Sequence, residues 1–423
     1  MKSYFILFAL LFATGRTAVS ADLIKPADTL PELFEQALAN NPELKSSRAR
    51  WQVYTDRVSQ ASALEDPMVM FKLQNLLARK PFSLGGNDPA TAKVIGVSQQ
   101  LPFWGKRANR EEIATLEAES YRWRFEEQKL QLRRMLTETY YQIWSLDKSL
   151  QLIEKNLKII SDFISIAESR YSVGQGVQQD IYKAGLERSK LLDKQIVLRQ
   201  QRMSLAAGLN YLLNRPGGTQ IATPPDFELP EKSVAADILN ALSLENRPEL
   251  KALKVLEKKG NVGRALAEKE YYPDFNLSFE YMFRQAAMGA SGDNMFTVGV
   301  TFNLPLQKER RHAMLAESNS ETNMADSDFN ALKSQISYTI SDTVARLERY
   351  RNQIQLYKNG IIPQAEQSLE SAVISYRVGR IDILALLDGQ MNLLNYEREL
   401  YASEAEYMIS LASLEAAVGV ELH

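Results

Sequence analysis

Two stretches in the second half of the chain alternate apolar and polar residues one by one. Their apolar members are Phe275, Leu277, Phe279, Tyr281 and Phe283, then Phe296, Val298, Val300, Phe302 and Leu304. A weaker copy of the pattern covers residues 68–74 and 95–101. A period of two predicts strands with one apolar face, each about as long as a tilted strand that crosses a bilayer, roughly nine to eleven residues. A two-sided sheet in a soluble α+β domain is the alternative, although few other elements are left to cover the apolar face.

A seven-residue period of apolar positions follows each strand pair. It runs through Leu146, Leu150, Ile153, Leu157, Ile160, Ile164, Ala167 and Tyr171, and more raggedly through Ile362, Ala365, Leu369, Ala372 and Tyr376. Alternating steps of three and four predict long helices packed with left-handed supercoiling. The helix from Arg107 to Tyr171 would be about 100 Å long at 1.5 Å per residue. Pro363, near Gly360, predicts a local kink in its counterpart.

The chain repeats one unit. Residues 40–45 recur at 246–251, an offset of 206, and residues 171–174 recur at 376–379, an offset of 205. Each half is predicted to run helix, strand, strand, long helix, helix. We expect a first repeat at 22–213 with strands at 67–102 and a hairpin tip near 171–177, a linker rich in proline and glycine at 214–234, and a second repeat at 235–419 with strands at 273–305 and a tip near 376–382.

Composition restricts where such a chain works. Residues 1–21 have a positive start at Lys2, an apolar run and small residues before a cleavage point, which predicts a signal peptide and export. The 50 basic and 52 acidic residues nearly cancel, so no attraction to nucleic acid is implied. The chain has no cysteine, which excludes disulfides, thiolate metal sites and a lipid-anchored cysteine. No later stretch reaches the roughly 18 apolar residues of a spanning helix, so a membrane crossing would use strands.

Four membrane strands are too few to close a barrel, and an open sheet edge in lipid leaves backbone groups unpaired. The barrel must therefore be shared between copies of the chain. Two copies would give about eight strands and a filled interior, whereas three would give about twelve and leave a passage. The predicted fold is mainly α with a membrane β-barrel, a trimer in which each protomer adds four strands and long coiled-coil hairpins.

The repeated Asn-Pro-Glu-Leu and Arg-Pro-Glu-Leu segments, the Gln100–Arg107 strand-to-helix junction and the paired Tyr-x-Val-Gly turns come in an order and spacing that resemble the TolC-type outer-membrane efflux proteins across essentially all of the mature chain. The resemblance implies a homotrimer in outer-membrane lipid of a Gram-negative bacterium, with a periplasmic helical tunnel. It also implies docking to a periplasmic adaptor protein and an inner-membrane pump of the RND or ABC type, which supplies the energy. The junction looks most like the heavy-metal branch of the family.

The same resemblance implies two sets of functional residues at the hairpin tips. Those implied to contact the adaptor are Tyr171, Val173, Gly174, Tyr376, Val378 and Gly379. Those implied to line the closed pore mouth are Asp180, Tyr376, Arg380, Asp382 and Asp388, with Asp180 accepting a hydrogen bond from Tyr376 on a neighbouring hairpin. The chain departs from the family at Ala385 and Ile381. The simpler alternative is that the glycines cap helices and the charged residues lie on solvated faces.

Phe103, Trp104, Lys106 and Arg107 suit a membrane-interface belt, with the two cations among lipid headgroups. No metal or cofactor site is predicted, since Met68, Met70, Met282, Met288 and Met295 serve more commonly as flexible packing than as ligands. Enzyme chemistry is not supported either. The histidines, His312 and His423, do not form a cluster, and the Ser145–Lys148 spacing has no companion motif. The remaining alternatives are a soluble periplasmic coiled-coil adaptor and a general diffusion porin, which the long helices disfavour.

Overall fold

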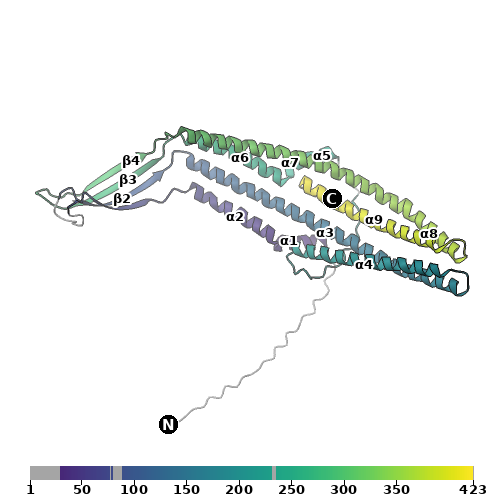
Figure 1. Ribbon diagram of the computed structural model, residues 1–423. Helices are drawn as coiled ribbons and strands as arrows, with labels where there is room; N and C mark the ends of the chain where they lie inside the picture. Colours follow the sequence, from purple (N-terminus) through teal and green to yellow (C-terminus); the bar gives the residue numbers. More distant parts are fainter. Residues whose placement is uncertain (1–28, 77, 80–87, 231–234, 423) are drawn as a thin grey trace, which may run out of the picture.

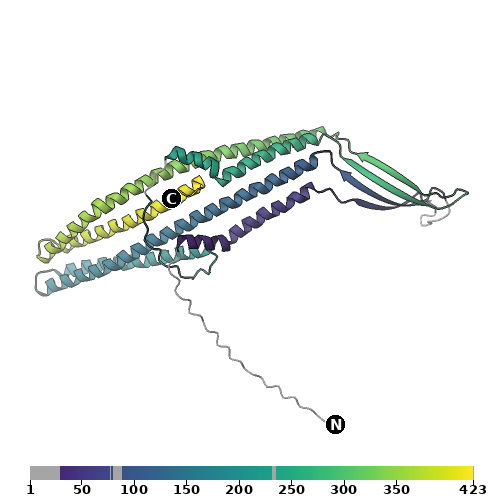
Figure 2. The same cartoon turned by 180° about the vertical axis from the view of Figure 1, so that it is seen from behind.

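The computed structural model describes residues 29–422 except residues 77, 80–87 and 231–234. The described chain is long and narrow, with a β-sheet at one end and two helical hairpin turns at the other (Figure 1). Seen from behind, the same helices connect the two ends (Figure 2). The predicted signal peptide at 1–21 lies outside the described residues.

The first half contains α1 (Leu30–Asn40), α2 (Pro42–Ser62), β1 (Met68–Gln74), β2 (Ala92–Leu101), α3 (Lys106–Ser172) and α4 (Gln178–Leu212). Asn41, in the repeated segment at 40–45, has a structural role at the start of α2. Its side chain caps α2 by accepting a hydrogen bond from the Leu44 N–H at 2.9 Å, next to Pro42 in the first turn. Its amide also donates to the Leu212 carbonyl at 3.0 Å, so one residue joins the start of α2 to the end of α4.

The second half contains α5 (Ala236–Asn246), α6 (Pro248–Lys269), β3 (Phe275–Arg284), β4 (Met295–Phe302), α7 (Lys308–Leu356), the π-helical turn η1 (Tyr357–Ile361), α8 (Ile362–Arg377) and α9 (Ile383–Val418). The expected disturbance at Pro363 takes the form of η1. Proline lacks an N–H and its ring crowds the carbonyl four residues earlier, and a wider turn just before it accommodates both defects.

The four strands form one antiparallel sheet in the order β1-β2-β3-β4. Val69, Val97, Phe279 and Val298 lie opposite one another in register. All four are exposed in the single chain. The alternating apolar residues of both halves therefore share one continuous uncovered face.

The opposite face of the sheet carries an ion pair and the small residue Gly96. Lys72 on β1 and Glu280 on β3 form an ion pair at 3.1 Å that crosses over β2. Gly96 makes room for it, because a Cβ there would lie 3.2 Å from the Glu280 Cγ and 3.1 Å from the Met70 Cε. Val94, also on this face, is buried.

Helix α3 runs through the middle of the helical part, where it packs against α2, α4, α6 and α9. Along its predicted heptad stripe, Ile153, Ile160 and Ala167 are buried, while the intervening leucines and isoleucine are partly buried against the same core. The buried Gln390 amide of α9 donates to the Asn156 side chain of α3 at 2.7 Å. This polar pair within an apolar seam fixes the register of the two helices.

Candidate functional site

Two hairpin turns lie side by side at the end of the molecule away from the sheet (Figure 1). Gly174 and Gly379 adopt left-handed conformations, with φ of 73° and 76°. In the first turn the Gly174 N–H donates to the Tyr171 carbonyl at 3.0 Å, and the next N–H donates to Arg170 at 2.9 Å. The second turn repeats both bonds. Each glycine thus closes a Schellman cap, a conformation that other residues adopt at a cost.

Apolar side chains at the turns remain uncovered. Val173 and Val378 are 67% and 64% exposed, and Tyr171 is 47% exposed. Val177 and Leu384, at the starts of the returning helices, are also exposed. We call these five residues the tip surface. An apolar patch at the end of a long helical body is typical of a surface that a partner protein covers.

Tyr376 occupies the opposite environment, buried between the two hairpins at 1% exposure. Its hydroxyl donates to the Asp180 carboxylate at 3.4 Å. Asp180 lies in the first turn of α4, where the helix dipole favours a negative charge. Burial raises the pKa of Tyr376, and the charge of Asp180 raises it further, so the phenol stays protonated and able to donate.

Arg170 joins the two turns and is a residue that sequence reasoning missed. One guanidinium nitrogen donates to the Tyr376 carbonyl and the other donates to the Gln175 carbonyl at 3.0 Å. The guanidinium also lies 4.7 Å from the centroid of the Tyr376 ring. The repeat offered a clue to its importance, because the matching position in the second half is Ser375. An arginine present in one half alone indicates a contact that only that half makes.

The remaining predicted pore residues are not drawn into this cluster. Asp382 is the N-cap of α9 and accepts a hydrogen bond from the Ala385 N–H at 2.9 Å. Arg380 and Asp388 are exposed on the second hairpin, and within the described part of the chain neither forms an ion pair. Their environment matches the simpler alternative of solvated helix faces in the single chain.

At the other end of α3, the aromatic residues of the junction form a layer where strands become helices. Phe103 stacks on Tyr272 with centroids 4.5 Å apart, and Trp104 meets Phe275 at 5.9 Å. Trp104 is 76% exposed. Gly105, with φ of 83°, provides the bend into α3. A large exposed indole at this boundary has the character of a membrane-interface residue.

The prediction that Lys106 lies among lipid headgroups is wrong. Lys106 is 1% exposed, and its ammonium contacts Asp274 at 2.9 Å, Glu270 at 3.3 Å and the Tyr272 carbonyl at 3.0 Å. Three acceptors from the α6–β3 connection match the three donors of the ammonium, so burial leaves no N–H unpaired. Arg107 instead donates to the Ser62 carbonyl at the end of α2, with Nε at 2.9 Å.

No metal site emerges among the residues that the structure describes, since no three histidine, aspartate or glutamate side chains are gathered to hold an ion. Met282 and Met295 pair across β3 and β4. However, an Arg284 nitrogen lies 3.3 Å from the Met295 sulfur, and a fixed cation there disfavours a metal cation. In the described ranges, no helix combines the length and apolar character needed to cross a membrane.

Comparison with known proteins identifies relatives over nearly all of the chain. The family model described as outer membrane efflux protein matches residues 33–215 and 239–420, one range in each half. The outer membrane efflux protein BepC of Brucella suis is 22% identical over 416 residues, which cover 96% of this chain and 87% of BepC. The cobalt-zinc-cadmium resistance protein CzcC of Cupriavidus metallidurans is 23% identical over 270 residues, 62% of this chain and 61% of CzcC.

A solved structure has the same fold. The outer membrane protein VceC of Vibrio cholerae superposes with a TM-score of 0.77 at 18% identity, covering 93% of this chain and 97% of that one. Because the match covers nearly all of both chains, the fold described above has been seen in a solved structure.

Proposed function

The chain belongs to the family of outer membrane efflux proteins and is an efflux channel of the outer membrane, and from this premise we propose that three copies close one duct. The observation that carries the proposal is the open sheet. Within the described part of the chain, β1 and β4 each pair with one neighbour, and one face of the sheet is apolar and uncovered. In lipid, an unpaired strand edge costs several kcal/mol per backbone group (roughly, by transfer scales), so both edges need a partner.

A second copy of the chain can supply that partner, because β4 and β1 are antiparallel in the order of the sheet. Three copies give about twelve strands, which leave a lumen wide enough for transport. The apolar face then points to lipid, and the face with the Lys72–Glu280 ion pair lines the lumen. Because α3 continues from β2 after a short bend, closing the strands gathers the helices into a tunnel.

We further propose that the tip surface contacts a periplasmic adaptor and, through it, an inner-membrane pump. Its apolar side chains lie far from the sheet, at the end that faces away from the membrane. The chain itself supplies a passage and performs no covalent chemistry. A soluble adaptor would expose the apolar sheet face to water, which disfavours that function. The function of a general diffusion porin does not require the long helices.

Docking is tested by placing a charge on the tip surface. Val173→Asp and Val378→Asp should abolish most export while leaving the trimer intact, since a buried carboxylate opposes an apolar contact. Ile238→Asp is the matched control, because this exposed apolar residue lies on α5, away from the tips. Zinc and cobalt tolerance and dye efflux would be measured in a strain lacking the native gene, with trimer content measured by native mass spectrometry. Unchanged export in both tip variants would disprove the docking role, and a purified monomer would disprove the duct.

The closed state of the tunnel is proposed to depend on the contacts between the two hairpins of each chain. Tyr376, Asp180 and Arg170 supply them, and the exposed Arg380 and Asp388 are free to meet a neighbouring copy at the tunnel mouth. Repeated by threefold symmetry, the carboxylates of Asp180 and Asp388 favour cations at the tunnel mouth.

A further inference from the structure

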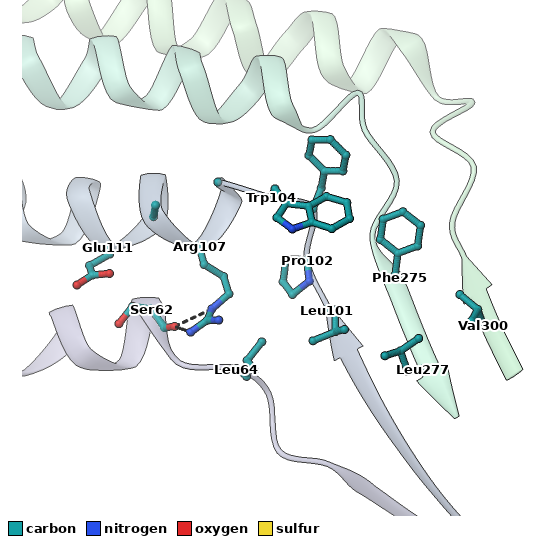
Figure 3. A pocket seen from close by; sticks show the side chains of 13 residues that line it. Ser62, Leu64, Leu101, Pro102, Trp104, Arg107, Glu111, Phe275, Leu277 and Val300 are labelled. Atoms are coloured by element: carbon teal, nitrogen blue, oxygen red, sulfur yellow. Dashed lines mark hydrogen bonds between the residues drawn. The ribbon is translucent and has the colours of Figure 1, made fainter. Parts of the chain in front are cut away.

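A groove of about 690 Å³ opens where the sheet meets the helices, between the end of α2 and the start of α3 (Figure 3). It is lined by residues from α2, β2, the junction, α3, β3 and β4. Its two ends differ chemically. The end toward the sheet is apolar, and the end toward the helices carries charged side chains.

The apolar end is part of the uncovered sheet face. Leu101, Leu277 and Val300 line it, and the register places Leu277 directly opposite Val300. The exposed Trp104 stands over this end, near Phe275 (Figure 3). A hydrocarbon chain laid along these residues would cover apolar surface that the protein leaves open.

The polar end holds one positive and one negative side chain, Arg107 and Glu111. Arg107 is anchored by donating through Nε and one terminal nitrogen to the Ser62 carbonyl, which leaves its other terminal nitrogen available. Glu111 follows one helical turn later and is exposed. Its carboxylate has no hydrogen-bond or ion-pair partner among the described residues. In Figure 3 both side chains lie near Ser62 at the helical end of the groove.

We propose that this groove binds one zwitterionic aminophospholipid. Its phosphate pairs with Arg107, its primary ammonium donates to Glu111, and an acyl chain lies along Leu101 and Leu277. The pair of opposite charges selects the headgroup. A lipid with phosphate but no amine leaves Glu111 unpaired beside a second negative charge, and a choline headgroup has no N–H to donate. The inference rests on the membrane placement of the sheet in the proposed function.

The test uses native mass spectrometry of the delipidated full-length protein. Phosphatidylethanolamine, phosphatidylglycerol and phosphatidylcholine with identical acyl chains are added one at a time, and retained lipid is counted. The wild type should prefer phosphatidylethanolamine about two- to fivefold, the range of an exposed ion pair. Glu111→Gln should remove this preference and keep the general lipid affinity. Glu112→Gln is the matched control, because its exposed carboxylate follows in sequence and does not line the groove.

Three further results test the proposed lipid site. Arg107→Gln should lower retention of all three lipids, since each has a phosphate. Equal retention of the three lipids by the wild type would overturn the proposal, as would an equal loss of preference in Glu111→Gln and Glu112→Gln. Trimer content and export are measured on the same variants. In Glu111→Gln, a lost preference with intact trimers and export separates this inference from the duct, whereas a wild-type protein that forms no trimers would disprove the duct itself.

Discussion

The two halves of the chain have the same elements, and they place matching residues in opposite environments. Tyr171 and Tyr376 are the same residue of the repeat, yet the first lies on the tip surface and the second is buried between the hairpins. At the other end, the buried Lys106 matches Glu309 at the offset of 203 that relates Gly96 to Gly299, and Glu309 is exposed. A repeated sequence therefore specifies repeated elements, whereas the burial of each copy depends on which neighbours the rest of the fold supplies.

The long helices differ in the same way. In the first half α3 runs for 67 residues without interruption. In the second, η1 separates α7 from α8. One hairpin thus continues as a single rod from the sheet to the tip, while the other has a π-helical turn in its path. Three substitution pairs, each comparing a residue with its counterpart or neighbour, and one comparison of pH profiles test how far this asymmetry matters.

The largest effect is expected at the junction. Lys106→Met leaves Asp274 without its cation, and Glu270 with only the exposed Arg110 at 3.5 Å, in a site that is largely closed to water. Removing one partner of such a cluster costs about 3–5 kcal/mol. Glu309→Gln, at the matching position of the second half, should stay within about 0.5 kcal/mol of the wild type. Thermal unfolding of the purified protein in detergent measures both, and similar midpoints for the two variants would contradict the asymmetry.

The next effect is expected at Arg170. Arg170→Met removes two charge-assisted hydrogen bonds, one to the Tyr376 carbonyl across the turns and one to the Gln175 carbonyl within the first turn, at a cost of about 1–3 kcal/mol for a partly exposed group. The hairpins should separate more often, which raises the rate of proteolytic cleavage within residues 173–177 and the current through single channels in a planar bilayer. Arg377→Met is the control, because that arginine is exposed in the matching turn. Equal cleavage rates in the two variants would rule out the bridging role.

Loss of one hydroxyl should have a smaller effect. Tyr376→Phe removes the hydrogen bond to Asp180 and keeps the ring and its contact with Arg170, for about 0.5–1.5 kcal/mol. Tyr171→Phe changes an exposed side chain and should alter nothing measurable. Single-channel current is the readout. If Tyr171→Phe opens the channel as much as Tyr376→Phe, the buried phenol is not part of the closed state.

The smallest effect is expected with alkaline pH. The pKa of Tyr376 is raised in the folded protein by burial and by Asp180, while Arg170 opposes the shift. The stabilising contribution of the neutral phenol is fully present below the unfolded pKa, about 10, and is lost as pH rises through the higher folded pKa. Wild-type current should therefore increase above about pH 10 relative to Tyr376→Phe, which has no proton to lose there. Parallel pH profiles for the two proteins would contradict this linkage.

Much of the fold was predictable because it depends on local periodicity. Alternating residues such as Phe279 and Val298 predicted strands, and the heptad stripe through Ile153 and Ile160 predicted the long helix that the structure contains. Arg170 was not predicted, because its contacts reach across 206 residues to the Tyr376 carbonyl. The headgroup role given to Lys106 failed for a related reason, since Asp274 and Glu270 are far away in sequence.

The sequence by itself determined the elements of this protein, their repetition and the apolar face of the sheet, because periods of two and of seven are written in neighbouring residues. Tertiary structure alone decided which tyrosine is buried, which cation is enclosed and where a groove with opposite charges opens. Burial and charge pairing depend on distances in space, and those distances are set when α3 packs against α6 and α9.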